Sequence, residues 1–172
     1  MTVPEPIDVH LFPQGVPTDE KDVARLFELY KLMVTSSESL VARRQGVNTF
    51  FVTMNGAVLT AAGFLLTNGK DPRLQMLGLM ALTVTGGILA FAWRSLILSF
   101  GQLNTGKFVV INRLEKVLPA AIYLAEWKAL GEGQQPKKYR TFTSKEVWTP
   151  WAFFAVYVTA TVAELATFFT IS

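Results

Sequence analysis

The sequence contains no cysteine and a single histidine, His10. Without thiols the chain forms no disulfide, no thiolate metal site and no cysteine nucleophile. One histidine is too few for a histidine-based zinc site within one chain. Charged residues are also scarce, at 17% of the chain against about 25% in an ordinary soluble domain. We therefore expect neither a bound metal nor another cofactor.

Apolar residues, in contrast, make up 51% of the chain, and its mean hydropathy is +0.33. Three runs carry no charge: 25 residues over 45–69, 20 residues over 74–93 and 17 residues over 147–163. A bilayer core needs about 20 helical residues to cross it. These runs predict an all-α membrane protein with three transmembrane helices, at 47–68, 74–94 and 147–170.

The remaining segments predict helices outside the membrane. Four prolines and no apolar core over residues 1–18 indicate a flexible N-terminal arm and not a signal peptide. Residues 19–46 predict an amphipathic helix that Thr18 caps. Residues 95–145 predict a helical region that Pro119 interrupts, with a flexible loop near 131–136. The apolar stripe of the first helix comprises Val23, Leu26, Phe27, Tyr30, Met33, Val34 and Leu40.

The positive charges predict the orientation. Of the sixteen Lys and Arg residues, five lie in residues 1–46, two in the loop 68–73 and nine in 94–145. Fourteen therefore lie on one side of the predicted spans, and the positive-inside rule places that side in the cytoplasm. We expect a bacterial inner-membrane protein with a cytoplasmic N-terminus and a periplasmic or extracellular C-terminus. Trp93, Trp148 and Trp151 fit the headgroup level at the cytoplasmic ends of their spans.

No motif points to an enzyme or to a nucleic-acid partner. The net charge of +3 and the isoelectric point near 9.3 follow from topology, and no nucleic-acid-binding motif accompanies them. There is no glycine-rich phosphate loop and no nucleophile elbow. Glu115 and Glu126 are a candidate carboxylate pair, but eleven residues and Pro119 separate them. We expect both to lie on solvated or salt-bridged helix faces.

Polar residues within the spans are candidate functional groups, because such residues are costly in lipid. The candidates for lining a pore or for hydrogen bonding between helices are Asn48, Asn55, Arg94 and Glu164. Small residues allow membrane helices to approach closely, so they predict contacts between subunits of a homo-oligomer. The candidate packing residues are Gly56, Thr60, Gly63, Gly86, Ala155, Thr159 and Ala163. Membrane lipids are the other expected partner.

Three segments in a fixed order carry a family resemblance. They are Leu29–Leu32 with Arg43, Arg44, Asn48–Phe51 and Asn55; Trp93, Arg94, Leu103, Asn104, Lys107–Ile111, Leu114, Glu115, Leu118 and Pro119; and Glu126–Leu130 with Lys138, Tyr139, Phe142, Thr143, Glu146 and Pro150. Over roughly residues 26–160 they resemble the RipA-like family of small octameric integral membrane proteins of bacteria. The resemblance implies an octamer and brings no catalytic residues.

Two functional hypotheses follow. The first is a homo-oligomeric, octameric inner-membrane protein of structural or interaction type, without enzymatic activity. The alternative is a pore-forming or channel-like membrane effector with the same subunits around an aqueous path. Small two-span effectors of the SLATT type also place arginines and asparagines ahead of the first span, but this chain has a third span.

Overall fold

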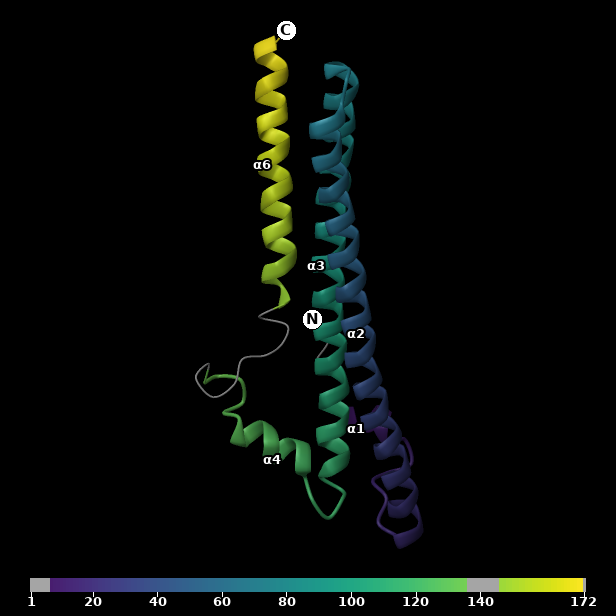
Figure 1. Ribbon diagram of the computed structural model, residues 1–172. Coiled ribbons are helices and arrows are strands. Elements are labelled where there is room, and N and C mark those ends of the chain that lie inside the picture. Colours follow the sequence, from purple (N-terminus) through teal and green to yellow (C-terminus); the bar gives the residue numbers. More distant parts are fainter. Residues whose placement is uncertain (1–6, 136–145, 172) are drawn as a thin grey trace. The chain divides into compact units, whose positions relative to one another are not determined.

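The computed structural model describes residues 7–135 and 146–171, and within these ranges it contains helices and no strands (Figure 1). Helices α2, α3 and α6 are each long and apolar enough to cross a membrane. The predicted all-α fold with three membrane-spanning helices is therefore confirmed. The helices are α1 (Ile7–Leu11), α2 (Glu20–Asn68), α3 (Pro72–Glu115), α4 (Ile122–Ala129) and α6 (Trp148–Ile171).

The chain divides into two compact units. The first unit comprises residues 1–41 and 102–140, and the second comprises residues 42–101 and 141–172. Helices α2 and α3 contribute to both units, whereas α1 and α4 belong to the first and α6 to the second. The three charge-free runs lie wholly in the second unit, so the first unit holds the amphipathic parts of the helices.

The core of the first unit is apolar and forms where α2 packs against α3. Leu26 and Tyr30 of α2 lie four residues apart, and Ile111 and Leu114 of α3 lie three apart, so each pair shares one helix face. Phe12 completes the buried cluster. Burial of these faces against each other is the main stabilising term for a helix hairpin in water.

Part of the N-terminal segment is packed, which differs from the flexible arm that we expected. Residues 7–11 form α1, and Phe12 is buried in the core of the first unit. Arg113 Nη2 donates to Asp8 Oδ2 at 2.9 Å, and Arg113 Nε pairs with Asp8 Oδ1. This hydrogen-bonded partner lowers the pKa of Asp8. The apolar anchor and the ion pair together hold α1 on α3.

The helix ends also differ in detail from the sequence expectation. Asp19, rather than Thr18, caps α2 by accepting the Asp22 N–H at 2.9 Å. Helix α3 ends at Glu115, four residues before Pro119. Residues 131–134 form a hydrogen-bonded turn in which Gly131, Glu132 and Gly133 have positive φ. Residue 136, the last residue of the expected flexible loop, lies outside the described residues, as does the rest of the predicted region up to residue 145.

The core of the second unit is built around an aromatic stack. Phe51 of α2 and Trp93 of α3 lie parallel, with ring centroids 5.9 Å apart. Ile97 is buried beside them, and Phe153 of α6 lies 6.1 Å from the Trp93 ring. This cluster holds the three apolar helices together at one level of the unit.

Candidate functional site

Asn48 bonds to a neighbouring helix. Its Oδ1 accepts a hydrogen bond from Trp93 Nε1 at 2.9 Å. Trp93 is 2% exposed, so its ring fills the core of the second unit and does not face a headgroup layer as the sequence suggested. The bond satisfies the indole N–H in an apolar surrounding, where a donor without a partner is costly.

Asn55 lies further along the same face of α2 and is 0% exposed. Its Nδ2 donates to the Phe51 carbonyl one turn earlier at 2.8 Å, while its Oδ1 has no hydrogen-bond partner. The hydroxyl of Tyr157 donates to the backbone carbonyl of Asn55 at 3.3 Å. Asn55 is thus enclosed by its own subunit, next to the contact between α2 and α6.

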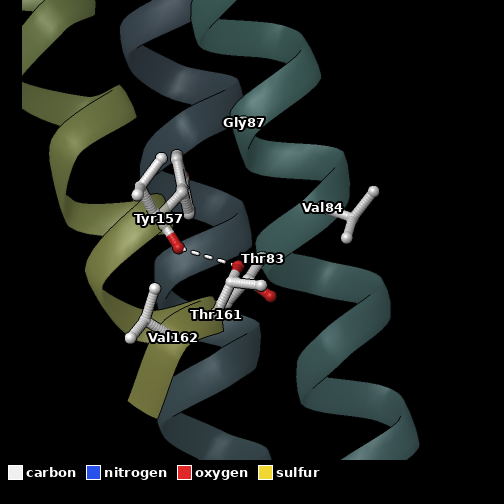
Figure 2. Close-up of a pocket in the computed structure, with 7 residues that line it drawn as sticks. Thr83, Val84, Gly87, Tyr157, Thr161 and Val162 are labelled. Atoms are coloured by element: carbon white, nitrogen blue, oxygen red, sulfur yellow. Dashed lines mark hydrogen bonds between the residues drawn. The ribbon is translucent and has the colours of Figure 1, made fainter. Parts of the chain in front are cut away.

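Glu164 bonds to α3 from the C-terminal half of α6. Thr83 Oγ1 lies 3.1 Å from Glu164 Oε2, within hydrogen-bond distance, and Thr83 is buried. A cavity of about 190 Å³ begins beside Thr83 and is lined mainly by apolar groups. Figure 2 shows this cavity and the bond in which the Thr161 hydroxyl donates to the Tyr157 carbonyl, at 2.9 Å. The Thr161 hydroxyl is thus satisfied by its own helix.

Arg94 lies at the end of the second charge-free run and contacts the start of α6. Its guanidinium carbon lies over the Trp151 ring, 5.3 Å from the centroid. Arg94, Pro150 and Trp151 line a second cavity of about 100 Å³. The Arg94 Nε is buried and has no hydrogen-bond partner.

The small residues divide into two groups. Gly86 is buried against Tyr157: a Cβ at Gly86 would lie 2.2 Å from the Tyr157 Cζ. The expectation that Gly86 faces another subunit is therefore corrected, since the tyrosine of the same chain occupies that space. The other six expected packing residues are exposed on the second unit: Gly56, Thr60, Gly63, Ala155, Thr159 and Ala163.

Glu115 is the main buried carboxylate of the first unit, at 1% exposure. It accepts hydrogen bonds from the Tyr30 hydroxyl at 3.0 Å and from the backbone N–H groups of Tyr123 and Leu124 at 2.9 and 3.0 Å. The two N–H groups belong to the first turn of α4, where helical donors lack intrahelical partners. Burial and the bond to Glu115 raise the pKa of Tyr30 to about 12.

This geometry corrects the expectation that Glu115 lies on a solvated or salt-bridged helix face. Glu126 is exposed, as we expected, and Glu115 is saturated by donors that orient α4. Sequence reasoning had no signal for the bond between Tyr30 and Glu115, because these two residues lie 85 residues apart. It also missed Tyr157, although a tyrosine within an apolar run is itself a sign that a hydroxyl needs a partner. Within the described residues no group of three or more His, Cys, Asp or Glu side chains is arranged to hold a metal.

The first unit exposes several large apolar side chains. Leu29 and Leu32 of α2, three residues apart on one face, are 58% and 67% exposed. The other large exposed apolar residues of its helices α2, α3 and α4 are Phe27, Val41, Leu103, Val109, Ile122 and Trp127. Large apolar side chains that are exposed side by side, as Leu29 and Leu32 are, mark an interaction site in a protein surrounded by water.

Comparison with known protein families gives a match over most of the chain. A family model described as the octameric membrane protein family (8xMP) matches residues 27–166. No curated protein and no solved structure matches the chain. The match spans most of the sequence, covers most of each of the three apolar helices and confirms the resemblance drawn over roughly residues 26–160. The chain belongs to the octameric membrane protein family.

Proposed function

We propose that this chain is a non-enzymatic subunit of a homo-octamer of structural or interaction type in the bacterial inner membrane. The family description supports the subunit number. The distribution of Lys and Arg supports a cytoplasmic N-terminus and a periplasmic or extracellular C-terminus. In this arrangement the first unit lies in the cytoplasm, and the second unit spans the membrane.

The exposed apolar surface of the first unit carries the proposal. Lipid covers apolar side chains on the second unit, but the helices of the first unit also carry exposed charges, such as Arg25 and Lys31, and belong in water. The exposed face of Leu29 and Leu32 therefore needs another protein surface. Neighbouring copies of the same chain supply that surface in an octamer.

The small residues of the second unit support close packing between copies. Gly56, Thr60 and Gly63 follow one another at intervals of four and three residues, so they share a face of α2. A Cβ at Gly56 or Gly63 would meet nothing within 4 Å. This face is open to the backbone of an adjacent membrane helix.

The test is the subunit count of the purified full chain, measured by native mass spectrometry in detergent. We expect eight subunits for the wild type. The double substitution Leu29→Asn and Leu32→Asn makes the apolar face polar, so it should shift the population to smaller species. The helix itself should persist, because both positions are exposed.

Lys31→Asn is the matched control, since it changes an exposed residue between the two leucines. We expect it to leave the octamer intact. A wild-type monomer or dimer would contradict the proposal. An octamer that survives the double substitution unchanged would show that the leucine face is not the contact.

A pore-forming or channel-like effector is the second candidate, because the spans carry polar residues. The hydrogen bond between Asn48 and Trp93 and the enclosure of Asn55 within its own subunit support the structural role instead. Single-channel recording in planar bilayers separates the two. Discrete openings that Asn55→Leu alters would favour the channel, whereas the structural role predicts no conductance.

A further inference from the structure

Arg94 is a cation with no acidic partner among the residues that the structure describes. No carboxylate there lies within ion-pair distance of it. Glu146, the acidic residue closest to the start of α6 in sequence, pairs with Arg44 at 3.3 Å. The Arg94 Nε is buried without a hydrogen-bond partner. Because a buried donor of a charged group is costly when unpaired, an anion is the expected complement.

The surroundings of Arg94 define what kind of anion fits. Trp151 lies against the guanidinium, which leaves the N–H groups in its plane to donate. The cavity beside it is about 100 Å³, room for about three water molecules. A phosphate group is on this scale, and arginine binds phosphate through two parallel hydrogen bonds.

The rest of the cavity is apolar. Ala90, Phe91 and Phe154 line it together with Pro150. Pro150 and Trp151 lie in the first turn of α6, where the helix dipole is positive. A positive group beside apolar side chains, at the end of a membrane span, matches the junction of a phosphate headgroup and an acyl chain.

We propose that Arg94, Trp151 and the first turn of α6 form a binding site for an anionic phospholipid. The phosphate binds the Arg94 guanidinium, and the adjoining acyl chain lies against Phe91 and Phe154. This inference rests on the membrane insertion in the proposed function, and on its orientation for the choice of the cytoplasmic leaflet. It does not depend on the number of subunits.

The experiment is a lipid titration of the full chain in detergent, read by native mass spectrometry. The probes are dioleoyl phosphatidylglycerol and dioleoyl phosphatidylcholine, which share acyl chains and differ in net charge. We expect wild-type protein to retain phosphatidylglycerol in preference. Arg94→Gln should reduce that preference about tenfold, the scale of one charged hydrogen bond. Arg94→Lys keeps the charge without the planar donor fork and should retain part of it.

Arg43→Gln is the matched control, because it removes an exposed positive charge from the same unit. It should leave the preference unchanged, whereas Trp151→Leu should weaken it. An unchanged preference in Arg94→Gln, or an equal loss in Arg43→Gln, would overturn the site. Binding of inorganic phosphate that displaces the lipid would overturn the choice of a lipid.

The same spectra separate this inference from the proposed octamer. A subunit number other than eight contradicts the octamer. The effect of Arg94→Gln on the lipid preference can still be measured in that case. A subunit number that changes in Arg94→Gln, with the lipid preference intact, would assign Arg94 to a contact between copies and overturn the lipid site.

Discussion

The ring of Tyr157 on α6 lies directly against Gly86 on α3, in the place where a side chain at position 86 would begin. A Cβ there would lie 2.2 Å from Cζ and 2.3 Å from Cε1 of the ring. The glycine thus allows close contact between two membrane helices of one chain, and it places the Tyr157 hydroxyl where it bonds to the Asn55 carbonyl. Three helices meet through this one contact.

Gly86→Ala should therefore destabilise the second unit by about 1–3 kcal/mol, the usual cost of overpacking. Unfolding of the purified protein in increasing dodecyl sulfate measures the change. Gly87→Ala is the matched control, because a Cβ at Gly87 meets nothing within 4 Å and both substitutions raise helix propensity equally. Equal stability of the two variants would contradict the close contact. Adding Tyr157→Leu to Gly86→Ala should restore part of the loss.

Glu115→Ala should release α4 from the first unit. The carboxylate accepts three hydrogen bonds, two of them from the first turn of α4, and their loss leaves buried donors unpaired. We expect a destabilisation of about 3 kcal/mol, since bonds to a charged group contribute about 1.5–3 kcal/mol each and do not add fully. Hydrogen exchange of residues 122–129, followed by mass spectrometry, should accelerate. Glu126→Gln, an exposed change within α4, should leave the exchange as in the wild type.

The hydroxyl of Tyr30 should lose its proton only at unusually high pH. Its pKa is raised to about 12, first by burial and then by the bond to Glu115, whereas an unfolded tyrosine titrates near 10. The folded chain therefore keeps a proton that the unfolded chain loses. This contribution to stability is complete below about pH 10 and is lost as the pH rises to about 12.

Absorbance of the phenolate group during alkaline titration measures this step. Burial and nearby carboxylates also raise the pKa of Tyr123, so the assignment needs a variant. Tyr30→Phe should remove one late step, and Glu115→Gln should move it to lower pH. A late step that persists in full in Tyr30→Phe would refute the assignment.

Asn48→Leu should destabilise the second unit by about 1–3 kcal/mol. It keeps the side-chain size but removes the acceptor of the Trp93 N–H, which leaves a buried donor unsatisfied. Unfolding curves in dodecyl sulfate measure the loss, with the exposed neighbour change Thr49→Val as control. Trp93→Phe removes the donor as well. The double variant should therefore be destabilised by less than the sum of the two single variants. Simple additivity would show that the bond contributes nothing.

The elements that depend on local pattern could be predicted from the amino-acid sequence alone. Charge-free runs of 17–25 residues predicted three membrane-spanning helices, because the length of an apolar helix and the thickness of the bilayer are matched directly. The amphipathic stripe with Leu26 and Tyr30 predicted a helix that packs outside the membrane. The segments between Leu29 and Pro150, in their order along the chain, indicated the family that the chain belongs to.

Which polar and small residues contact one another depends on how the helices pack. Glycines look alike in sequence, yet they differ in the fold. The ring of Tyr157 occupies the space beside Gly86, whereas the space beside Gly56 and Gly63 is empty. The sequence predicted Glu115 on a solvated or salt-bridged helix face. In the fold it is buried and bonds to Tyr30, which lies 85 residues away in the sequence. Local pattern sets the apolar face of a helix, but rotation and register between helices depend on the fit of all side chains at once. Side-chain packing therefore determines which groups contact Gly86, Glu115 and Arg94.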